Sequence, residues 1–173
     1  MHILMNFLQQ YSYLGLFVAL MLEYLFVPIP GETTLTAIGV LAPKFHWNVV
    51  LLILSTGLGS FIGSAASYFL GQRVGLPFLY RYGRFVFLSP ARIDKASLLF
   101  SKYTVPTLLF SRYVSGVRLV VPVLAGIQRV PLGLYLRITF VTAFLWVSTY
   151  ILAGQAMFHA GQWIIQHVRL LLH

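Results

Sequence analysis

Cysteine is absent from this 173-residue chain, and acidic residues number only three. The lack of cysteine excludes disulfide frameworks and thiolate metal or redox sites. With a single aspartate, Asp94, the chain cannot present the paired acids of metal-dependent phosphoryl or phosphatidyl transferases, and no Ser-His-Asp arrangement is credible. We therefore expect no enzymatic activity, no metal site and no cofactor.

Charged residues are also scarce, at 9% of the chain, whereas hydrophobic residues make up 59% and the mean hydropathy is +0.85. Too little polar surface remains to cover a water-soluble globule, so the chain belongs in lipid. Its formal net charge of +9 then favours anionic membrane lipids, rather than nucleic acid, as partners. Because residues 1–22 contain no Lys or Arg and no small-residue cleavage pattern follows, we expect no cleavable signal peptide.

Two uncharged stretches are long enough to span a bilayer. Between Lys44 and Arg73 lie 28 residues without a charged side chain, and between Arg137 and Arg169 lie 31. Each exceeds the roughly 20 apolar residues that a spanning helix needs. The first stretch carries small residues at every fourth position, on one helix face: Gly59, Gly63, Ser67, Gly71 and Gly75. We interpret this face as a helix-packing seam rather than a ligand site, and it also permits a homodimer.

Two other hydrophobic stretches are interrupted. Residues 11–43 are broken by Glu23 and by the sequence Val-Pro-Ile-Pro-Gly-Glu at 27–32, and residues 103–128 are broken around 112–118. Because prolines and glycine do not continue an ordinary helix, we predict hairpin turns at Pro28, Pro30, Gly31 and Ser115. Apolar arms such as 33–42 would rise about 15 Å, roughly half the hydrocarbon thickness. Arms of that length suit re-entrant hairpins better than full spans.

The order of the segments, a broken stretch followed by a span, occurs twice. Gly31 and Gly116 lie 85 residues apart, and Pro43 and Pro131 lie 88 apart. Interrupted hydrophobic segments at corresponding positions of two halves are typical of transporter binding sites. We predict an all-α integral membrane protein with two opposed re-entrant helical hairpins plus spanning helices, in a pseudo-symmetric inverted repeat. The single domain, residues 1–173, divides into a first half at about 1–75, a connector at 76–103, a second half at about 104–157 and an interfacial tail at 158–173.

The connecting stretch is basic. Residues 73–102 hold six of the twelve Lys and Arg residues, which predicts that this stretch is cytoplasmic. Ser89 can cap a helix with Pro90 at its first position. Apolar residues then share one face, opposite Arg92, Lys95 and Lys102: Ile93, Ala96, Leu99 or Phe100, and Tyr103. We interpret this segment as an amphipathic helix on the membrane surface, and the short segment from Gln162 to His173 as another.

Four charged residues lie inside hydrophobic segments: Glu23 and Glu32 flank the first break, and Arg112 and Arg118 flank the second. A charge at the centre of a lipid-exposed helix costs about 2.5 to 3.5 kcal/mol on insertion scales, so such residues face a polar interior and pair with one another. They could be structural ion pairs, and Glu32 could simply favour the positive end of a helix. For the two arginines we favour an anion site, because backbone N–H groups after Gly116 together with guanidinium groups suit a phosphate.

The residues at the two breaks resemble the signatures of the DedA family. Residues 23–32 read Glu-Tyr-Leu-Phe-Val-Pro-Ile-Pro-Gly-Glu, similar to the family's Glu, Pro-x-Pro-Gly-Glu signature. Residues 110–118, Phe-Ser-Arg-Tyr-Val-Ser-Gly-Val-Arg, and the Val-Pro-Val-Leu-Ala-Gly that follows at 121–126 look like its second signature. The likeness runs from about Tyr13 to Gly154, and it departs from the family at Ser115, where proline is usual.

This resemblance implies lipid translocation in the bacterial inner (cytoplasmic) membrane, by a multi-pass protein with the fold expected above. Bacterial members are associated with recycling undecaprenyl phosphate or with moving phospholipids such as phosphatidylethanolamine, with dependence on the proton gradient. The family's acidic and arginine residues correspond here to Glu23, Glu32, Arg112 and Arg118.

We therefore predict proton-coupled flipping of undecaprenyl phosphate. In this hypothesis Arg112, Arg118 and Gly116 bind the phosphate, and Glu23 and Glu32 compete with it for the arginines. The alternatives are a general phospholipid flippase or scramblase, a non-transporting membrane scaffold, and a proton-coupled exporter of small cations.

Overall fold

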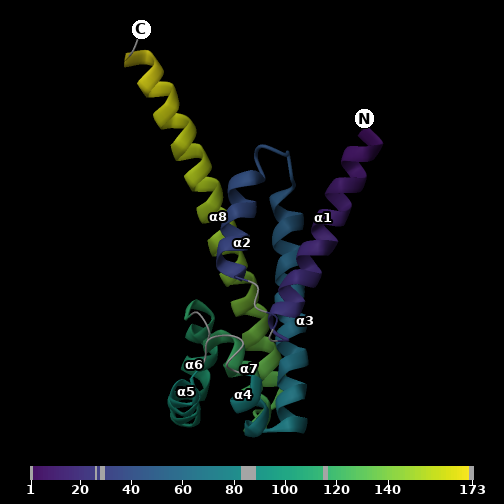
Figure 1. Ribbon diagram of the computed structural model, residues 1–173, viewed down its shortest axis with the longest axis vertical. Helices are drawn as coiled ribbons and strands as arrows, with labels where there is room; N and C mark the ends of the chain where they lie inside the picture. Colours follow the sequence, from purple (N-terminus) through teal and green to yellow (C-terminus); the bar gives the residue numbers. More distant parts are fainter. Residues whose placement is uncertain (1, 26, 28–29, 83–88, 115–116, 172–173) are drawn as a thin grey trace.

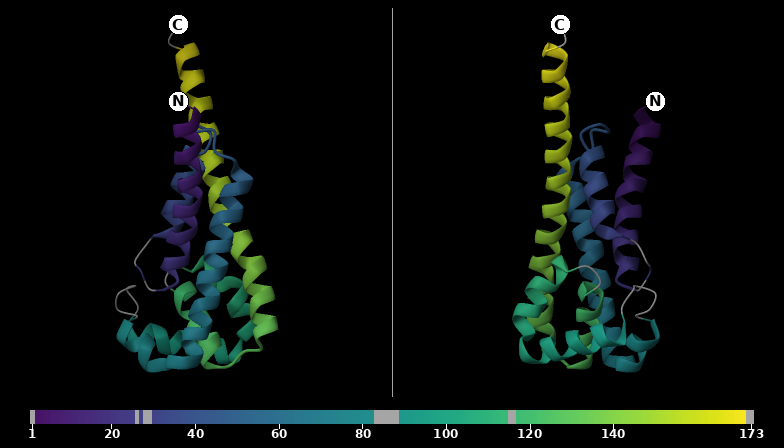
Figure 2. Two further views of the ribbon diagram at one scale, coloured as in Figure 1. Left: turned by 90° about the vertical axis from the view of Figure 1, so that its right-hand side faces the viewer. Right: turned by 60° about the vertical axis from the view of Figure 1, so that its left-hand side comes forward.

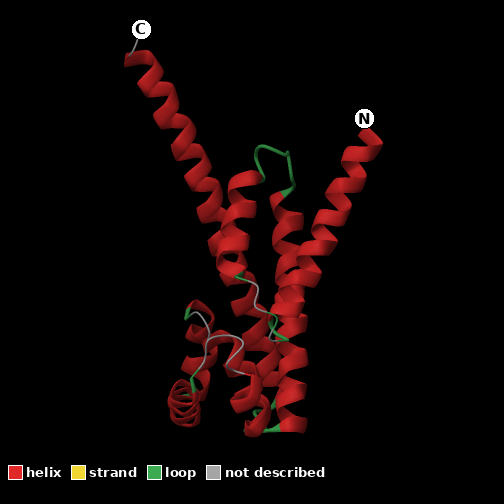
Figure 3. Ribbon diagram, in the orientation of Figure 1, coloured by secondary structure: helices red, strands yellow, loops and turns green. Residues whose placement is uncertain are grey.

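The computed structural model describes residues 2–25, 27, 30–82, 89–114 and 117–171, and over these ranges the chain contains helices and no strand (Figure 3). Two helices are long and apolar enough to cross a membrane, as predicted: α3, Val49–Val74, and α8, Leu132–Leu171. Asn48 starts α3, because its side-chain oxygen accepts hydrogen bonds from the N–H groups of Val50 and Leu51, at 2.9 and 3.3 Å. Gly75 ends α3 with a φ of 72°, a conformation that favours glycine.

The two interrupted stretches form shorter helices. The first contains α1, His2–Glu23, and α2, Gly31–Leu41; the second contains α6, Thr104–Phe110, the 3-10 helix η2, Ser111–Tyr113, and α7, Val117–Ile127. Pro30 directly precedes α2, at the predicted break, whereas the predicted turn residues Pro28 and Ser115, like Gly116, lie outside the described residues. At 11 residues each, α2 and α7 have lengths that rise about half the hydrocarbon thickness.

These two helix pairs enter the molecule from opposite ends. Figure 1 shows α1 and α2 extending from the end that holds both termini, whereas α6 and α7 lie at the other end. The end of α1 and the first turn of α7 meet, because the side chains of Glu23 and Arg118 are in contact. The position of the hairpins within a bilayer and the inverted repeat stay predictions.

Close backbone contacts hold the long helices together. The small-residue face of α3 lies against two helices of the same chain: Gly59 and Gly63 lie against the backbone of Phe17 and Met21 in α1, and Gly71 against that of Val123 in α7. This face is therefore occupied within the chain. A homodimer would need another surface, because a second copy cannot use a seam that α1 and α7 already cover.

A second close crossing, which the sequence analysis did not single out, joins α2 to α8. A methyl group on Gly39 would lie 3.1 Å from the Cα of Gly154, and one on Gly154 would lie 3.0 Å from the Cα of Gly39. The absence of both side chains lets α2 pack along α8.

The connector contains α4, Leu76–Tyr82, and α5, Pro90–Lys102, which lie across the end of the long helices (Figure 2). The buried face of α5 consists of Ile93, Ala96 and Phe100, so Phe100 rather than Leu99 completes it. Tyr103 is exposed, contrary to the predicted face, because the backbone leaves the helix there with a φ of −134°. The Tyr80 hydroxyl donates to Asp94, and this hydrogen bond raises the pKa of Tyr80 above its ordinary value.

The helix α8 continues to Leu171, through most of the segment that we predicted as a separate tail at 158–173. No proline lies between Leu132 and Leu171, so nothing in the sequence forces the helix to stop at 158. Residues 158–171 are an extension of the span rather than a new element, and their position at a membrane interface stays a prediction.

Candidate functional site

The carboxylate of Glu23 is fully buried and links the end of α1 to the start of α2. Glu23 is the last residue of α1, and its Oε1 accepts a hydrogen bond from the backbone N–H of Gly31, the first residue of α2, at 3.0 Å. A methyl group on Gly31 would lie 2.5 Å from Glu23 Oε2, so any larger residue at this position would push the carboxylate away from the place that it occupies here. The N-terminus of α2 thus receives a negative charge, which the helix dipole favours.

Arg118 lies in the first turn of α7 and faces this carboxylate. Its Nη2 atom forms an ion pair with Glu23 Oε1 and a second one with Glu32 Oε2, at 3.2 Å. The guanidinium lies 4.5 Å from the ring centre of Trp146 in α8. Arg118 is buried, whereas the side chain of Glu32 is 24% exposed. Glu23 and Glu32 lie on the two sides of the first break, and Arg118 lies just after the second. Arg118 therefore connects the two breaks by pairing with both acids.

Arg112, in η2, is equally buried but binds neutral oxygen atoms. Its guanidinium donates to the hydroxyl of Tyr24, to Ser60 Oγ at 2.9 Å and to Thr142 Oγ1 at 3.0 Å. It also lies 5.3 Å from the centre of the Tyr24 ring. Within the described part of the chain, neither acid forms an ion pair with Arg112. Arg112 thus lies in the interior without a carboxylate partner in the described residues, held by hydroxyl groups from three helices or their ends.

A small central cavity lies between the two arginines. Its volume is about 10 Å³, which is room for about one water molecule. Arg112, Arg118, Ser111 and Tyr135 are among its lining residues. The predicted pocket is therefore closed here: a phosphate group does not fit until the surrounding helices separate.

Several polar atoms of the cluster are buried without a hydrogen-bond partner among the described residues. They are Nε and Nη1 of Arg118 and Oε2 of Glu23. A buried donor or acceptor without a partner costs about 1–3 kcal/mol, and more for a charged group. These atoms are two hydrogen-bond donors on Arg118 and one acceptor on Glu23.

Glu32 faces a second space, which we call the α2 groove, between α2 and α8. This groove has a volume of about 460 Å³, and Glu32, Thr33, Thr36 and Tyr150 are among the residues that line it. Glu23 does not line it. Of the two acids, Glu32 is thus the one that can be reached from outside the cluster.

The sequence-predicted site residues are in part brought together. Glu23, Glu32 and Arg118 form one ion-paired cluster, and Arg112 lines the same central cavity as Arg118. The predicted phosphate ligand Gly116 lies outside the described residues. In the described part of the chain, no three His, Asp or Glu side chains lie close enough together to hold a metal ion.

Sequence reasoning missed the hydroxyl-bearing residues around Arg112: Tyr24, Ser60 and Thr142. Tyr24 directly follows Glu23 in the sequence, and Ser60 directly follows a glycine of the packing seam. The sequence signal that could have indicated partners for Arg112 was the presence of hydroxyl-bearing residues within hydrophobic segments. Serine and threonine can also bond to their own helix backbone, as Thr142 does to Ile138 at 2.8 Å, so their presence alone did not reveal an arginine partner.

Comparison with known proteins gives separate evidence on the family of this chain. The VTT domain model matches residues 29–156 of the chain. The membrane protein YbfM of Bacillus subtilis is 31% identical, over 91% of this chain and 97% of the relative. Undecaprenyl phosphate transporter A of Staphylococcus aureus is 24% identical, over 90% of this chain and 78% of the relative.

A relative from Lactococcus lactis subsp. cremoris, named alkaline phosphatase-like protein, is 28% identical over 90% of this chain and 75% of that protein. No solved structure matches the chain significantly. The two family signatures lie at the two breaks, and the helices at those breaks place both acids in contact with Arg118, whereas Arg112 lines the same central cavity as Arg118. The match of the domain model over most of the chain, together with YbfM, establishes the family: the chain belongs to the VTT-domain, or DedA, family of membrane proteins.

Proposed function

We propose that the chain moves a phosphate-bearing lipid, undecaprenyl phosphate, across the bacterial cytoplasmic membrane. The name of the Staphylococcus aureus relative supports this substrate, and a Bacillus subtilis relative of the same name is 25% identical over 92% of this chain. In this proposal Arg112 and Arg118 bind the phosphate, while the hydrocarbon chain stays in the surrounding lipid. The protein acts without enzymatic chemistry.

The proposal rests on the hydrogen-bond partners of two buried guanidinium groups, those of Arg112 and Arg118. Arg112 has only neutral partners, and Arg118 has two nitrogen atoms without any partner in the described part of the chain. A phosphate oxygen is the ligand that such donors bind best, since charge-assisted hydrogen bonds are about twice as strong as neutral ones. Both groups border one cavity, so a single phosphate could bind both once that cavity opens.

Charge balance supports coupling to protons. Two carboxylates and two guanidinium groups give the cluster a formal charge of zero. A phosphate that enters this buried site makes it negative, and an uncompensated buried charge is costly. A phosphate monoester carries one or two negative charges near neutral pH. Uptake of one proton for each of these charges, by one of the two acids or by both Glu23 and Glu32, restores neutrality and releases Arg118 from the protonated acid. Deprotonation on the other side of the membrane returns the acid to Arg118 and expels the phosphate.

A flipping assay with purified protein in lipid vesicles tests this proposal. Labelled undecaprenyl phosphate is placed in one leaflet, and its arrival in the other is measured. We expect Arg118→Gln and Arg112→Gln to slow transfer at least tenfold, whereas Arg137→Gln, which changes an exposed arginine of α8, leaves the rate unchanged. Equal rates for the Arg118 and Arg137 variants would contradict the phosphate-binding role.

The same assay separates the alternatives. Phosphatidylethanolamine that moves as fast as undecaprenyl phosphate would indicate a general phospholipid flippase, and no lipid movement by the wild type would indicate a scaffold. For proton coupling, a pH gradient should accelerate transfer by the wild type but not by Glu23→Gln. An equal response of both proteins to the gradient would exclude Glu23 as the coupling acid.

A further inference from the structure

A second cavity lies outside the arginine cluster, at the end of the molecule that holds the connector. It has a volume of about 460 Å³, within the range of small-molecule binding sites. We call it the α5 groove, because α5 forms one wall; α6, η2 and the start of α7 form the others. Its lining includes two basic side chains, Arg92 and Lys95, and apolar side chains that include Leu99, Phe110 and Val114.

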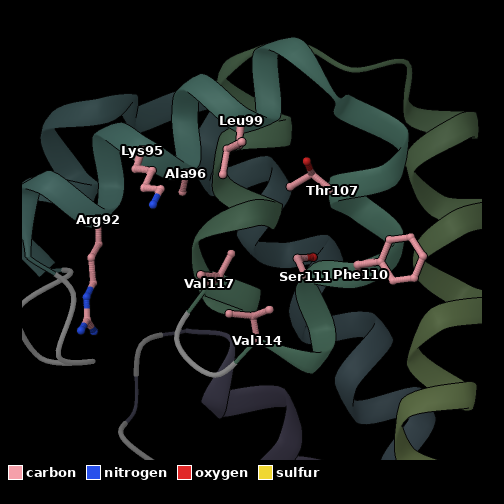
Figure 4. Close-up of a pocket in the computed structure, with 9 residues that line it drawn as sticks. All are labelled: Arg92, Lys95, Ala96, Leu99, Thr107, Phe110, Ser111, Val114 and Val117. Carbon is pink, nitrogen blue, oxygen red and sulfur yellow. The ribbon is translucent and has the colours of Figure 1, made fainter.

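The two cations of the α5 groove come from one helix face. Arg92 and Lys95 are three residues apart in α5, and Leu99 follows one turn later on the same side. Figure 4 shows Lys95 and Leu99 pointing from α5 towards the space between the helices, with Thr107 and Ser111 on the opposite wall. A pair of basic groups beside an apolar wall matches the two parts of a lipid phosphate, its headgroup and its hydrocarbon chain.

In the described part of the chain, no acidic side chain pairs with these two cations, Arg92 and Lys95. The neighbouring acid, Asp94, accepts the hydrogen bond of the Tyr80 hydroxyl on α4. The apolar lining is also uncovered, because Leu99, Phe110 and Val114 are exposed. Both the positive charge and the apolar surface therefore remain available to a ligand.

One residue connects the α5 groove to the proposed transport site. Ser111 lines the α5 groove and also the central cavity between Arg112 and Arg118. It directly precedes Arg112 in the sequence and is itself buried. The η2 segment, which contains Ser111, thus separates a phosphate held by Arg92 and Lys95 from Arg112 and Arg118.

We propose that the α5 groove is a docking site for a lipid phosphate, in which Arg92 and Lys95 bind the headgroup and Leu99, Phe110 and Val114 contact the chain. This inference rests on the proposed function, because it places the groove before the arginine cluster on the path of the same lipid. The groove loads the lipid from the leaflet next to the connector. The hairpins must then separate at Ser111 for the phosphate to reach Arg112.

Binding measurements on the full-length protein in detergent test this proposal without relying on transport. The probe is dioctanoyl phosphatidic acid, and the controls are dioctanoyl phosphatidylcholine and inorganic phosphate at the same ionic strength. We expect Lys95→Gln to weaken binding of the acidic lipid about fivefold, since a basic residue near an anionic surface contributes about 1 kcal/mol. Lys102→Gln removes the same charge from the same helix but does not line the groove, so it should leave binding unchanged.

A second matched pair tests the apolar wall. Leu99→Gln should weaken binding of the lipid, whereas Leu98→Gln, which changes an exposed neighbour outside the groove, should not. Inorganic phosphate should bind at least tenfold more weakly than the lipid. Equal effects of the two lysine variants, equal effects of the two leucine variants, or equal affinity for inorganic phosphate and the lipid would each overturn the proposal.

The binding measurements and the flipping assay test the two proposals separately. If Arg118→Gln blocks transfer but Lys95 and Lys102 variants bind the lipid equally, the groove is not a docking site and the proposed function stands. If the wild type binds the acidic lipid in the groove as expected but moves none, the docking site stands and the proposed function fails.

Discussion

At the level of single residues, the two acids of the cluster have different surroundings although both contact Arg118. Glu23 is fully buried and also bonds to the backbone of Gly31, whereas Glu32 is partly exposed in the α2 groove. Burial removes the competing water around Glu23, so its interaction with Arg118 is less screened. The two acids should therefore contribute differently to stability.

We expect Glu23→Gln to lower the free energy of unfolding by about 3–5 kcal/mol, because it leaves Arg118 with less compensation in a buried site. The same substitution at Glu32 should cost about 1 kcal/mol or less, because water that reaches its partly exposed carboxylate screens the interaction with Arg118. Thermal unfolding in detergent measures both. In the double variant Glu23→Gln with Arg118→Gln, the loss should be smaller than the sum of the two single losses. Additive losses would show that the pair is not coupled.

The hydroxyl of Tyr24 offers a second prediction at this scale. It accepts a hydrogen bond from Arg112, and Ser60 Oγ donates to it at 3.4 Å. Removing it in Tyr24→Phe keeps the ring but should lower the free energy of unfolding by about 1.5–3 kcal/mol, the contribution of a hydrogen bond to a charged group. Tyr103→Phe, at an exposed position, is the control, and a thermal midpoint shared by both variants would contradict the role of Tyr24.

How far the sequence predicts the site depends on the residue type. Glutamate and arginine in an apolar segment are costly, so Glu23, Glu32, Arg112 and Arg118 could be selected from the sequence alone. Which acid pairs with which arginine could not be predicted from the sequence, because the pairing depends on which side chains the packed helices turn towards one another. Both arginines were expected near acids, yet Arg112 binds Tyr24, Ser60 and Thr142, whose hydroxyl groups are common in any sequence.

At the level of helices, the long apolar spans and the two breaks were predictable, because charge-free length and proline have strong local effects. The partners of each helix were not. The small-residue face of α3 was identified as a seam, but only the fold assigns Gly63 to α1 and Gly71 to α7. The contact of Gly39 with Gly154 joins residues far apart in the sequence and left no periodic signal.

The crossing of α2 and α8 gives a prediction at this scale. A methyl group on Gly39 meets the backbone of Ile151 and Gly154, which cannot move as a flexible side chain can. We expect Gly39→Ala to lower the free energy of unfolding by about 1–3 kcal/mol, as overpacking does. Gly133→Ala is the matched control, because nothing lies within 4 Å of the added methyl group. Equal thermal midpoints for the two variants would show that the crossing can relax.

At the level of the whole molecule, two open spaces adjoin the cluster of acids and arginines. The α2 groove reaches Glu32, and the α5 groove reaches Ser111, which also lines the central cavity between the arginines. The helix α2 extends from the end of the molecule that holds both termini, whereas α5 and α6 lie at the other end (Figure 1). If the chain spans the membrane as proposed, the two grooves should open towards opposite leaflets.

The lack of cysteine makes this arrangement easy to test, because an introduced thiol has no competitor. Thr36→Cys places a thiol in the α2 groove, and Thr107→Cys places one in the α5 groove. A reagent that does not cross membranes should label the two variants from opposite sides of oriented vesicles, with Thr107→Cys on the cytoplasmic side. Labelling of both from one side would contradict the opposed arrangement and the predicted orientation of the connector.

The equal numbers of acids and arginines in the cluster also have an electrical consequence. A transmembrane voltage acts on a displaced unit charge with about 2.3 kcal/mol per 100 mV, and four groups that together carry no net charge experience no net force when they move as a unit. One phosphate charge accompanied by one proton preserves that cancellation. The empty and the loaded protein would then change conformation at rates that the membrane potential does not alter. The difference in pH between the two compartments and the lipid concentrations of the two leaflets, rather than the voltage, would set the direction of travel.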